Sequence, residues 1–128
     1  MAMKVVAHLR FVAWYRSLRQ DRSAAAQFLA AGVNVAVGYL ARSELDELRR
    51  PRAERVASSR HYPKMWELRH AARTEAGREV NLRVLAVVDE RVGVVLLAGD
   101  KTGNWRDWYE AAVPSADALY DDFLRRYQ

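Results

Sequence analysis

Three cationic side chains stand where a folded sheet would bring them together. Arg69 lies at the end of one predicted strand, Arg83 lies in the next strand, and Lys101 directly follows a third. Because neighbouring strands are about 5 Å apart, these side chains could converge on one side of the sheet and form a cationic cradle. Arginine binds phosphate through paired hydrogen bonds. The spacing therefore indicates phosphate chemistry.

Each of these cations also has a structural explanation. Arg69 follows Glu67 by two residues, so both point to the same face of a strand and could form an ion pair. Arg83 has apolar neighbours, among which an arginine is costly unless it is paired or used. Lys101 lies in the loop 99–103, where a solvated lysine is common. This loop lacks the spacing of a nucleotide-binding P-loop, which excludes that function.

Proton transfer needs groups other than arginine, and two candidates are present. His61 is of a residue type that titrates near neutrality, and the phenol of Tyr109 could donate a proton to a leaving oxygen. Glu67 could act as a base, although we favour a role in orienting Arg69. A surface histidine and a packed tyrosine are the structural alternatives for the first two residues.

The chain of 128 residues is basic, with a formal net charge of +5. Residues 49–83 hold ten basic and four acidic side chains, whereas residues 104–128 hold three basic and five acidic ones. Concentrated positive charge favours an anionic partner, either a nucleic acid or an acidic protein. Arginine outnumbers lysine by 18 to 3, which suits phosphate recognition but would also follow from a GC-rich genome.

Several function classes are excluded or disfavoured by composition. The absence of cysteine excludes disulfides and thiolate metal sites, and three scattered histidines do not form a zinc motif, so we expect no metal or cofactor. The apolar start is too short for a signal peptide. The apolar run over 28–40 contains Asn34 and falls short of a membrane span. We expect one soluble, cytoplasmic domain over residues 1–128.

The elements that must position the cations follow from the apolar periodicity. The pattern predicts a strand over 3–7, a helix over 8–18 and a longer helix over 24–40 that runs antiparallel to the first. Gly32 and Gly38 each weaken that second helix by about 1 kcal/mol relative to alanine. They leave a kink or an early stop open.

The middle of the chain predicts a sheet. Residues 51–63 have the character of an ordered polar loop, and three strands follow over 64–70, 80–89 and 91–99. Short turns between these strands favour an antiparallel meander. The last two strands are apolar on both faces, so both faces of the sheet should be covered.

The end of the chain returns to helical spacing over 105–127, with an interruption predicted at Pro114. Together the patterns predict an α+β fold. It consists of an N-terminal strand and two helices packed on an antiparallel sheet of about four strands, followed by a C-terminal helix.

A family resemblance rests on five segments in a fixed order. They are Ser59–Arg69 (SRHYPKMWELR), Leu82–Leu85 (LRVL), Leu96–Asn104 (LLAGDKTGN), Trp105–Tyr109 (WRDWY) and Pro114–Tyr120 (PSADALY). Their order and spacing resemble the phage-derived-protein branch of the RelE/HigB toxin family, and the last two look like the closing helix of actinobacterial members. The resemblance covers roughly residues 50–124, and the first 49 residues only in outline.

The resemblance implies a RelE-like fold and the toxin of a type II toxin–antitoxin system. Such a toxin cleaves messenger RNA on the ribosome and is held inactive by a HigA-like helix-turn-helix antitoxin. Metal-free cleavage uses the 2′-hydroxyl of RNA as nucleophile, so a site must orient that hydroxyl, neutralise the phosphorane and protonate the leaving oxygen. Arg69, Arg83 and Lys101 would supply much of this.

The same resemblance gives RNA-binding candidates. Arg60 and Lys64 would contact the phosphate backbone, and Trp105 would stack on a base, with Trp66 and Trp108 as further stacking candidates although Trp108 also suits the core. Related members often carry a histidine at the position of Phe123, and this chain has no histidine after position 70. The proton donor is therefore the least defined part of the predicted site.

Two other functions fit parts of the pattern. The missing histidine favours a non-catalytic module on the same fold, such as a ParE-like gyrase inhibitor or an inactive regulator. The Lys-x-x-Glu-Leu-Arg and Gly-Asp-Lys motifs at 64–69 and 99–101 favour the ribonuclease, because they mark the HigB branch. A general DNA- or RNA-binding domain would need a helix rich in exposed arginine, and none is predicted.

Overall fold

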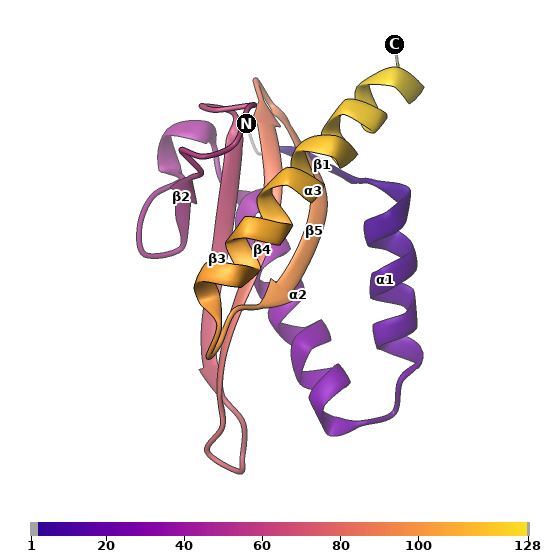
Figure 1. The fold of residues 1–128 in the computed structure, drawn as a ribbon, viewed down its shortest axis with the longest axis vertical. Coiled ribbons are helices and arrows are strands. Elements are labelled where there is room, and N and C mark those ends of the chain that lie inside the picture. The colour runs from indigo at the N-terminus through magenta and orange to yellow at the C-terminus, as the bar shows by residue number, and fades with distance from the viewer. Residues whose placement is uncertain (1–2, 128) are drawn as a thin grey trace.

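The computed structural model describes residues 3–127, which form helices on both faces of one sheet (Figure 1). The elements are β1 (Lys4–Ala7), α1 (Leu9–Gln20), α2 (Ala24–Arg42), the short 3-10 helix η1 (Leu45–Glu47), β2 (Ala53–Arg55), β3 (Met65–Arg73), β4 (Glu79–Asp89), β5 (Val92–Asp100) and α3 (Trp105–Arg126). Over the described residues, the five strands have the order β1-β5-β4-β3-β2. Only the β1–β5 pair among them is parallel. The predicted α+β fold is confirmed, with one strand more than expected.

The helical hairpin of α1 and α2 begins each helix with a side-chain cap. His8 accepts a hydrogen bond from the backbone N–H of Arg10, and Ser23 accepts one from Ala26, as N-cap residues do. The longer second helix is confirmed, and the early stop that Gly32 and Gly38 left open does not occur, because α2 is continuous to Arg42. A Cβ atom at Gly32 would lie 3.1 Å from side chains of β3 and β4, so this glycine permits close packing of α2 on the sheet.

By length and composition alone, α2 could cross a membrane, so the sequence-based judgement that this apolar run is too short was wrong. In the structure its inward side belongs to the core. Val33, Ala36 and Leu40 are buried in one cluster with residues of the sheet. This is the packing of a core helix in a folded domain.

The edge strand β2 lies inside a segment that the sequence predicted as a loop. Ala53, Glu54 and Arg55 pair antiparallel with Leu68, Glu67 and Trp66 of β3. A three-residue strand is too short to show the alternation by which strands are recognised. This strand places Glu54 beside Arg69, one of the predicted cationic residues.

Alternation along β3 divides its side chains between the two faces of the sheet. Trp66 and Leu68 are buried in the cluster under α1 and α2, whereas Met65 is buried in the cluster under α3. Because successive side chains of a strand point to opposite faces, Glu67 and Arg69 share the α3 face with Met65. The predicted covering of both faces is confirmed.

Helix α3 crosses the second face without a break, so the predicted interruption at Pro114 is wrong. Proline removes one backbone hydrogen bond from a helix, but Ala112, Val113 and Ala116 around it are buried against the sheet, and this packing stabilises the helix. At its start, Trp108 lies directly over Gly99 of β5. A Cβ at Gly99 would be 2.5 Å from the indole Nε1, so glycine is required for this approach.

Candidate active site

Arg69 and Arg83 are direct partners across the β3–β4 ladder. Two like charges opposite each other destabilise a sheet, so this pair needs nearby anions. Both side chains lie on the α3 face, by the alternation described above. The convergence of these two arginines is the centre of what we call the cationic cluster, defined as Glu54, Glu67, Arg69, Arg83, Lys101 and Tyr109.

Glu67 is the buried anion of the cationic cluster, with only 5% of its surface exposed. Its Oε1 atom accepts a hydrogen bond of 2.7 Å from Nε of Arg69, and its Oε2 atom accepts one from the hydroxyl of Tyr109. The ion pair considered as a structural alternative for Arg69 is therefore present. Since both carboxylate oxygens are engaged, Glu67 is placed to orient its two neighbours.

Glu54 supplies a second anion from β2. It pairs with Arg69 and with the exposed Arg50. Burial lowers the pKa of Arg69, but the hydrogen bond and charge of Glu67, helped by the charge of Glu54, outweigh burial and raise it above the ordinary value. Arg69 is thus held by two carboxylates. Sequence reasoning missed Glu54 because β2 itself was not predicted.

Arg83 differs from Arg69 in having no carboxylate partner among the described residues. It is 8% exposed, one of its terminal nitrogens donates a 2.9 Å hydrogen bond to the carbonyl of Leu82, and its Nε has no partner within residues 3–127. A buried guanidinium group without an anion is costly. Such a group is a strong candidate for binding a phosphate that arrives with the substrate.

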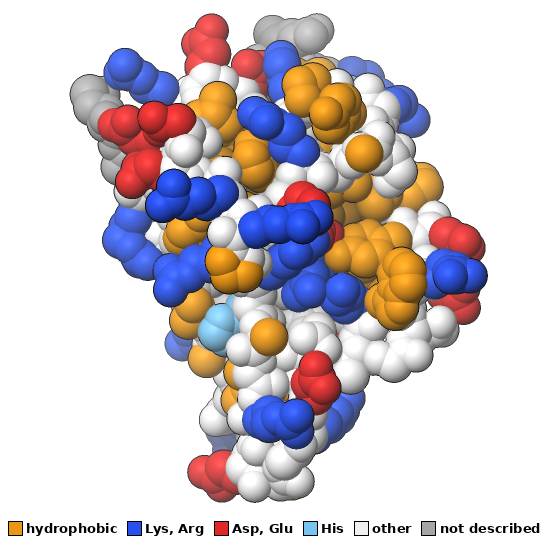
Figure 2. All heavy atoms as spheres, turned by 90° about the vertical axis from the view of Figure 1, so that its left-hand side faces the viewer, with side chains coloured by type: hydrophobic (Ala, Val, Ile, Leu, Met, Phe, Trp, Pro, Cys, Tyr) orange, Lys and Arg blue, Asp and Glu red, His pale blue; other side chains and the backbone are white. Residues whose placement is uncertain are grey.

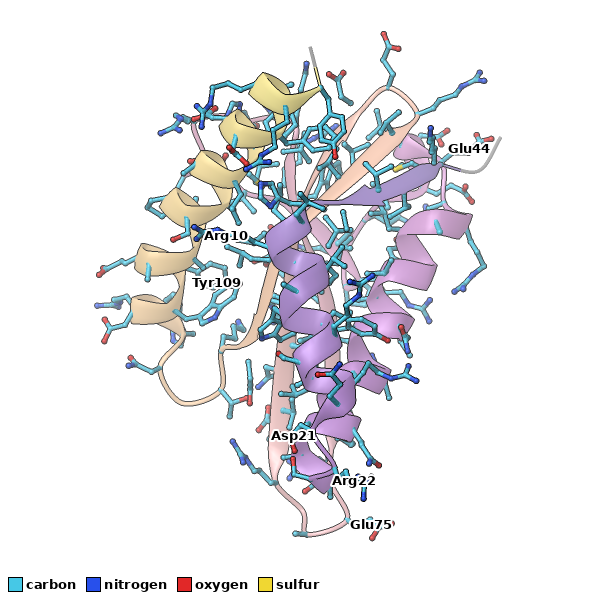
Figure 3. All side chains as sticks on the ribbon, turned by 90° about the vertical axis from the view of Figure 1, so that its right-hand side faces the viewer. Arg10, Asp21, Arg22, Glu44, Glu75 and Tyr109 are labelled. Atoms are coloured by element: carbon cyan, nitrogen blue, oxygen red, sulfur yellow. The ribbon has the colours of Figure 1, made fainter. Side chains whose placement is uncertain are left out.

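Lys101 and Tyr109 close the cationic cluster. The Lys101 ammonium lies 5.6 Å from the centre of the Tyr109 ring, and burial together with the charge of Arg83 lowers the pKa of Lys101. Tyr109 extends from α3 toward the sheet (Figure 3). Burial and its hydrogen bond to Glu67 raise the pKa of Tyr109 to about 12, so the phenol keeps its proton at neutral pH.

The tryptophans have three different environments. Trp105 is 55% exposed and meets the ring of Tyr109 edge-on at 6.4 Å, so it borders the cationic cluster. Trp108 is half-buried between α3 and Gly99. Trp66 is 4% exposed and lies under the other pair of helices, so it is not available to stack on a base.

Other predicted site residues lie near the far end of α3. We call them the latch, defined as Ser59, Arg60, His61, Asp117 and Asp121. His61 Nε2 lies 2.8 Å from Asp121, Arg60 pairs with the same aspartate, and Ser59 donates a 2.5 Å hydrogen bond to Asp117. At 1.5 Å per residue, Asp121 is about 18 Å along the helix from Tyr109. The structure does not bring His61 or Arg60 to the cationic cluster.

Lys64 is also separate, since it pairs with Asp89 at 3.2 Å where β3 begins and β4 ends. Across residues 3–127, no three His, Asp or Glu side chains gather to hold a metal ion. The groups that can act together are therefore the two arginines, the lysine, the phenol and the carboxylates of the cationic cluster. They can bind a phosphate and donate protons to it.

A mostly antiparallel sheet between a helical hairpin and a C-terminal helix, with cations gathered under that last helix, defines a RelE-like toxin fold. Comparisons with known proteins agree. The chain is 32% identical over 112 residues, covering 87% of this chain and 84% of the relative, to "Putative toxin HigB3" of Mycobacterium tuberculosis (strain ATCC 25618 / H37Rv). No family model matches the chain, and no solved structure does so.

A second relative from the same strain, "Putative toxin HigB2", is 33% identical over 79 residues, covering 61% of this chain and 37% of that protein. The protein belongs to the HigB/RelE-type toxins of toxin–antitoxin systems. The family resemblance found in the sequence is confirmed.

Proposed function

We propose that this toxin is a metal-free endoribonuclease that cleaves messenger RNA on the ribosome in the cytoplasm and so stops translation. The observation that carries the proposal is the pair of arginines facing each other on β3 and β4, of which Arg83 is buried with no carboxylate partner among residues 3–127. An RNA phosphate would supply the missing negative charge. The toxin names of the two relatives support the same direction.

In the proposed reaction the 2′-oxygen attacks the adjacent phosphorus, the bond from phosphorus to the 5′-oxygen breaks, and a 2′,3′-cyclic phosphate forms. The proton of the 2′-hydroxyl leaves to a water molecule, and the 5′-oxygen takes a proton from an acid of the cationic cluster. Arg69 and Arg83 would stabilise the negative charge of the phosphorane, which is the step where fixed charges contribute most. Lys101 and Tyr109 would act as the acid: the pKa of Tyr109 is raised to about 12, so its phenol holds a proton at neutral pH, and the lowered pKa of Lys101 makes its ammonium a stronger acid than an ordinary lysine.

Glu67 would act through its neighbours. It holds Arg69 through Nε and fixes the Tyr109 hydroxyl, so it sets the direction of a cation and of a proton donor. The complete engagement of its two oxygens favours this orienting role over that of a base. His61 is not part of the proposed reaction, because Asp121 and the ring of Tyr120 hold it in the latch.

A cognate antitoxin of the HigA-like, helix-turn-helix type completes the proposal. An uncovered cationic surface would bind RNA indiscriminately in a growing cell, since phosphate contacts carry no sequence information. An acidic segment of the antitoxin would neutralise that surface.

The test compares induced expression of the natural chain with an Arg83→Ala variant, by growth curves and by primer extension on a translated message. We expect arrest with new 5′ ends at translated positions, both lost in the variant. Arg16→Ala changes an exposed arginine on α1 and is the matched control, which should still arrest growth. Arrest with intact messages would instead indicate gyrase inhibition, and absence of arrest an inactive binding module.

A further inference from the structure

Four arginines gather around the edge strand β2, outside the cationic cluster. Arg49, Arg50, Arg52 and Arg55 are all exposed, and Glu54 is the single acidic residue between positions 49 and 55. Figure 2 looks onto this edge of the sheet and shows Lys and Arg side chains gathered across its middle, with hydrophobic side chains beside them. We call this set the edge arginines.

Two of the edge arginines lie against aromatic rings. The Arg55 guanidinium lies 4.6 Å from the centre of the Trp66 ring, and its Nε donates to the carbonyl of Pro63. The Arg52 guanidinium lies 5.4 Å from the centre of the Tyr39 ring. Stacking on a ring uses the flat face of a guanidinium group and leaves its N–H edge available for phosphate.

Two hollows lie beside the edge arginines. A hollow of about 150 Å³ is lined by Val35, Ala36, Tyr39, Arg52, Arg69 and His70. A hollow of about 340 Å³ is lined in part by Tyr39, Arg49, Arg50 and Arg52. Both are lined by Tyr39 and Arg52, and the smaller one is also lined by Arg69 of the candidate site. We call the two hollows together the path beside β2.

The lining of this path fits single-stranded RNA. Guanidinium groups match phosphates, and an aromatic ring beside exposed Val35 offers a surface to a base, which is the usual combination in single-strand binding. The carboxylate in the larger hollow, Glu47, already accepts a 2.7 Å hydrogen bond from the backbone N–H of Glu44. Within the described residues, Arg49 and Arg52 form no ion pair with a carboxylate.

We infer that the edge arginines bind the backbone of the RNA segment that flanks the cleaved nucleotide, leading it around β2 from Arg69 toward Arg49. This inference rests on the proposed function and deepens it. Contact of this kind adds affinity and salt dependence without base preference. The cationic cluster performs the chemistry, and the edge arginines hold the strand.

The experiment measures binding of a 12-nucleotide 2′-O-methyl RNA by fluorescence anisotropy over a series of salt concentrations. This probe cannot be cleaved because its 2′-oxygen is blocked. Each phosphate contact to a single strand contributes about 0.7 to the slope of log K against log salt. We expect the double substitution Arg49→Gln and Arg52→Gln to reduce the magnitude of that negative slope by about 1.4, because two phosphate contacts are lost.

The matched control is Arg16→Gln with Arg22→Gln, which removes the same amount of charge from the α1–α2 hairpin. Figure 3 shows Arg22 at the bottom of the view, where the two helices are joined. Its slope should stay close to that of the natural chain, and thermal unfolding should show that both variants are folded. An unchanged slope in the Arg49/Arg52 variant, an equal fall in the control, or no binding by the natural chain would overturn the inference.

Two further outcomes separate this inference from the proposed function. If the natural chain binds the probe through the edge arginines but produces no cleaved message, the ribonuclease proposal fails and the binding surface stands. If the Arg49/Arg52 variant binds the probe like the natural chain but escapes its antitoxin, the edge arginines belong to the antitoxin interface. That result would overturn the inference.

Discussion

The two ends of α3 contact similar sets of charged side chains, but these charges are paired differently at each end. At its start, the cationic cluster brings three cations to two carboxylates, and Arg83 is left without an anion among the described residues. At its far end, the latch pairs Arg60 and His61 with Asp121. Asp117 accepts hydrogen bonds from Ser59 and the backbone of Arg60. The arginine of the latch has a carboxylate partner, whereas Arg83 of the cationic cluster has none among the described residues.

This difference shows that residue type does not identify a site. Arginine, histidine and acidic residues occur in both places, and the sequence offered His61 and Arg60 as functional candidates. What separates the two places is whether folding gives each arginine a carboxylate partner. The paired groups of the latch hold a loop to a helix, whereas a buried arginine without a carboxylate is energetically costly and indicates a ligand.

The largest effect on stability should come from Glu67→Gln. Removing one partner of a buried ion pair costs about 3 kcal/mol of unfolding free energy, and here Arg69 and Arg83 would also face each other with one anion fewer. Urea unfolding measures the change. Glu54→Gln is the comparison, and its effect should be smaller because Glu54 is more exposed. Equal effects would contradict the assignment of Glu67 as the central anion.

In the latch, Asp117→Ala should lower the unfolding free energy by about 2 kcal/mol, because the Ser59 hydroxyl and the Arg60 backbone N–H lose their acceptor. Urea unfolding again measures the change. Growth arrest and message cleavage should persist at a temperature where the variant is folded. Loss of cleavage by folded protein would show that the latch takes part in the chemistry.

Arg83→Met should raise the stability rather than lower it. Replacing a buried, unpaired guanidinium group by an apolar chain of similar length is expected to raise the unfolding free energy by about 1 kcal/mol, while cleavage is lost. Denaturant unfolding and primer extension on the same preparation test both parts. A clearly destabilised variant would mean that Arg83 is a structural residue rather than a phosphate ligand.

The smallest change in stability should come from Lys101→Met, and its size should depend on pH. Burial and the charge of Arg83 lower the pKa of Lys101, so the folded state holds this proton less tightly than the unfolded chain, and stability falls as the pH drops from 10.5 through the lowered pKa. Lys101→Met removes that effect. The stability gained by the variant should be largest near pH 7 and shrink toward pH 10.5, measured by urea unfolding at several pH values.

Much of the cationic cluster could be predicted because it depends on local patterns. Strand alternation and short turns place Arg69 and Arg83 on two neighbouring strands and Lys101 directly after the next one, and a spacing of two places Glu67 beside Arg69. The pairing of His61 could not be predicted in this way. Its partner Asp121 is 60 positions away, and no local pattern carries that information.

Two further differences have the same origin. Glu54 was missed because β2 has three residues, too few for a periodic signal. The interruption predicted at Pro114 and the early stop left open by Gly32 and Gly38 do not occur, because tertiary packing outweighs intrinsic propensity. The sequence thus predicts which elements exist and which faces they bury, and it fails where a contact is made between distant segments.

The parallel pairing of β1 with β5 has a consequence for synthesis. Lys4 pairs with Val92, and Tyr109 comes later still, so neither the sheet nor the cationic cluster can be complete until most of the chain has left the ribosome. Contacts between distant segments also slow folding. The groups proposed to act on RNA are therefore assembled only at the end of folding, after the residues of α3 have been made.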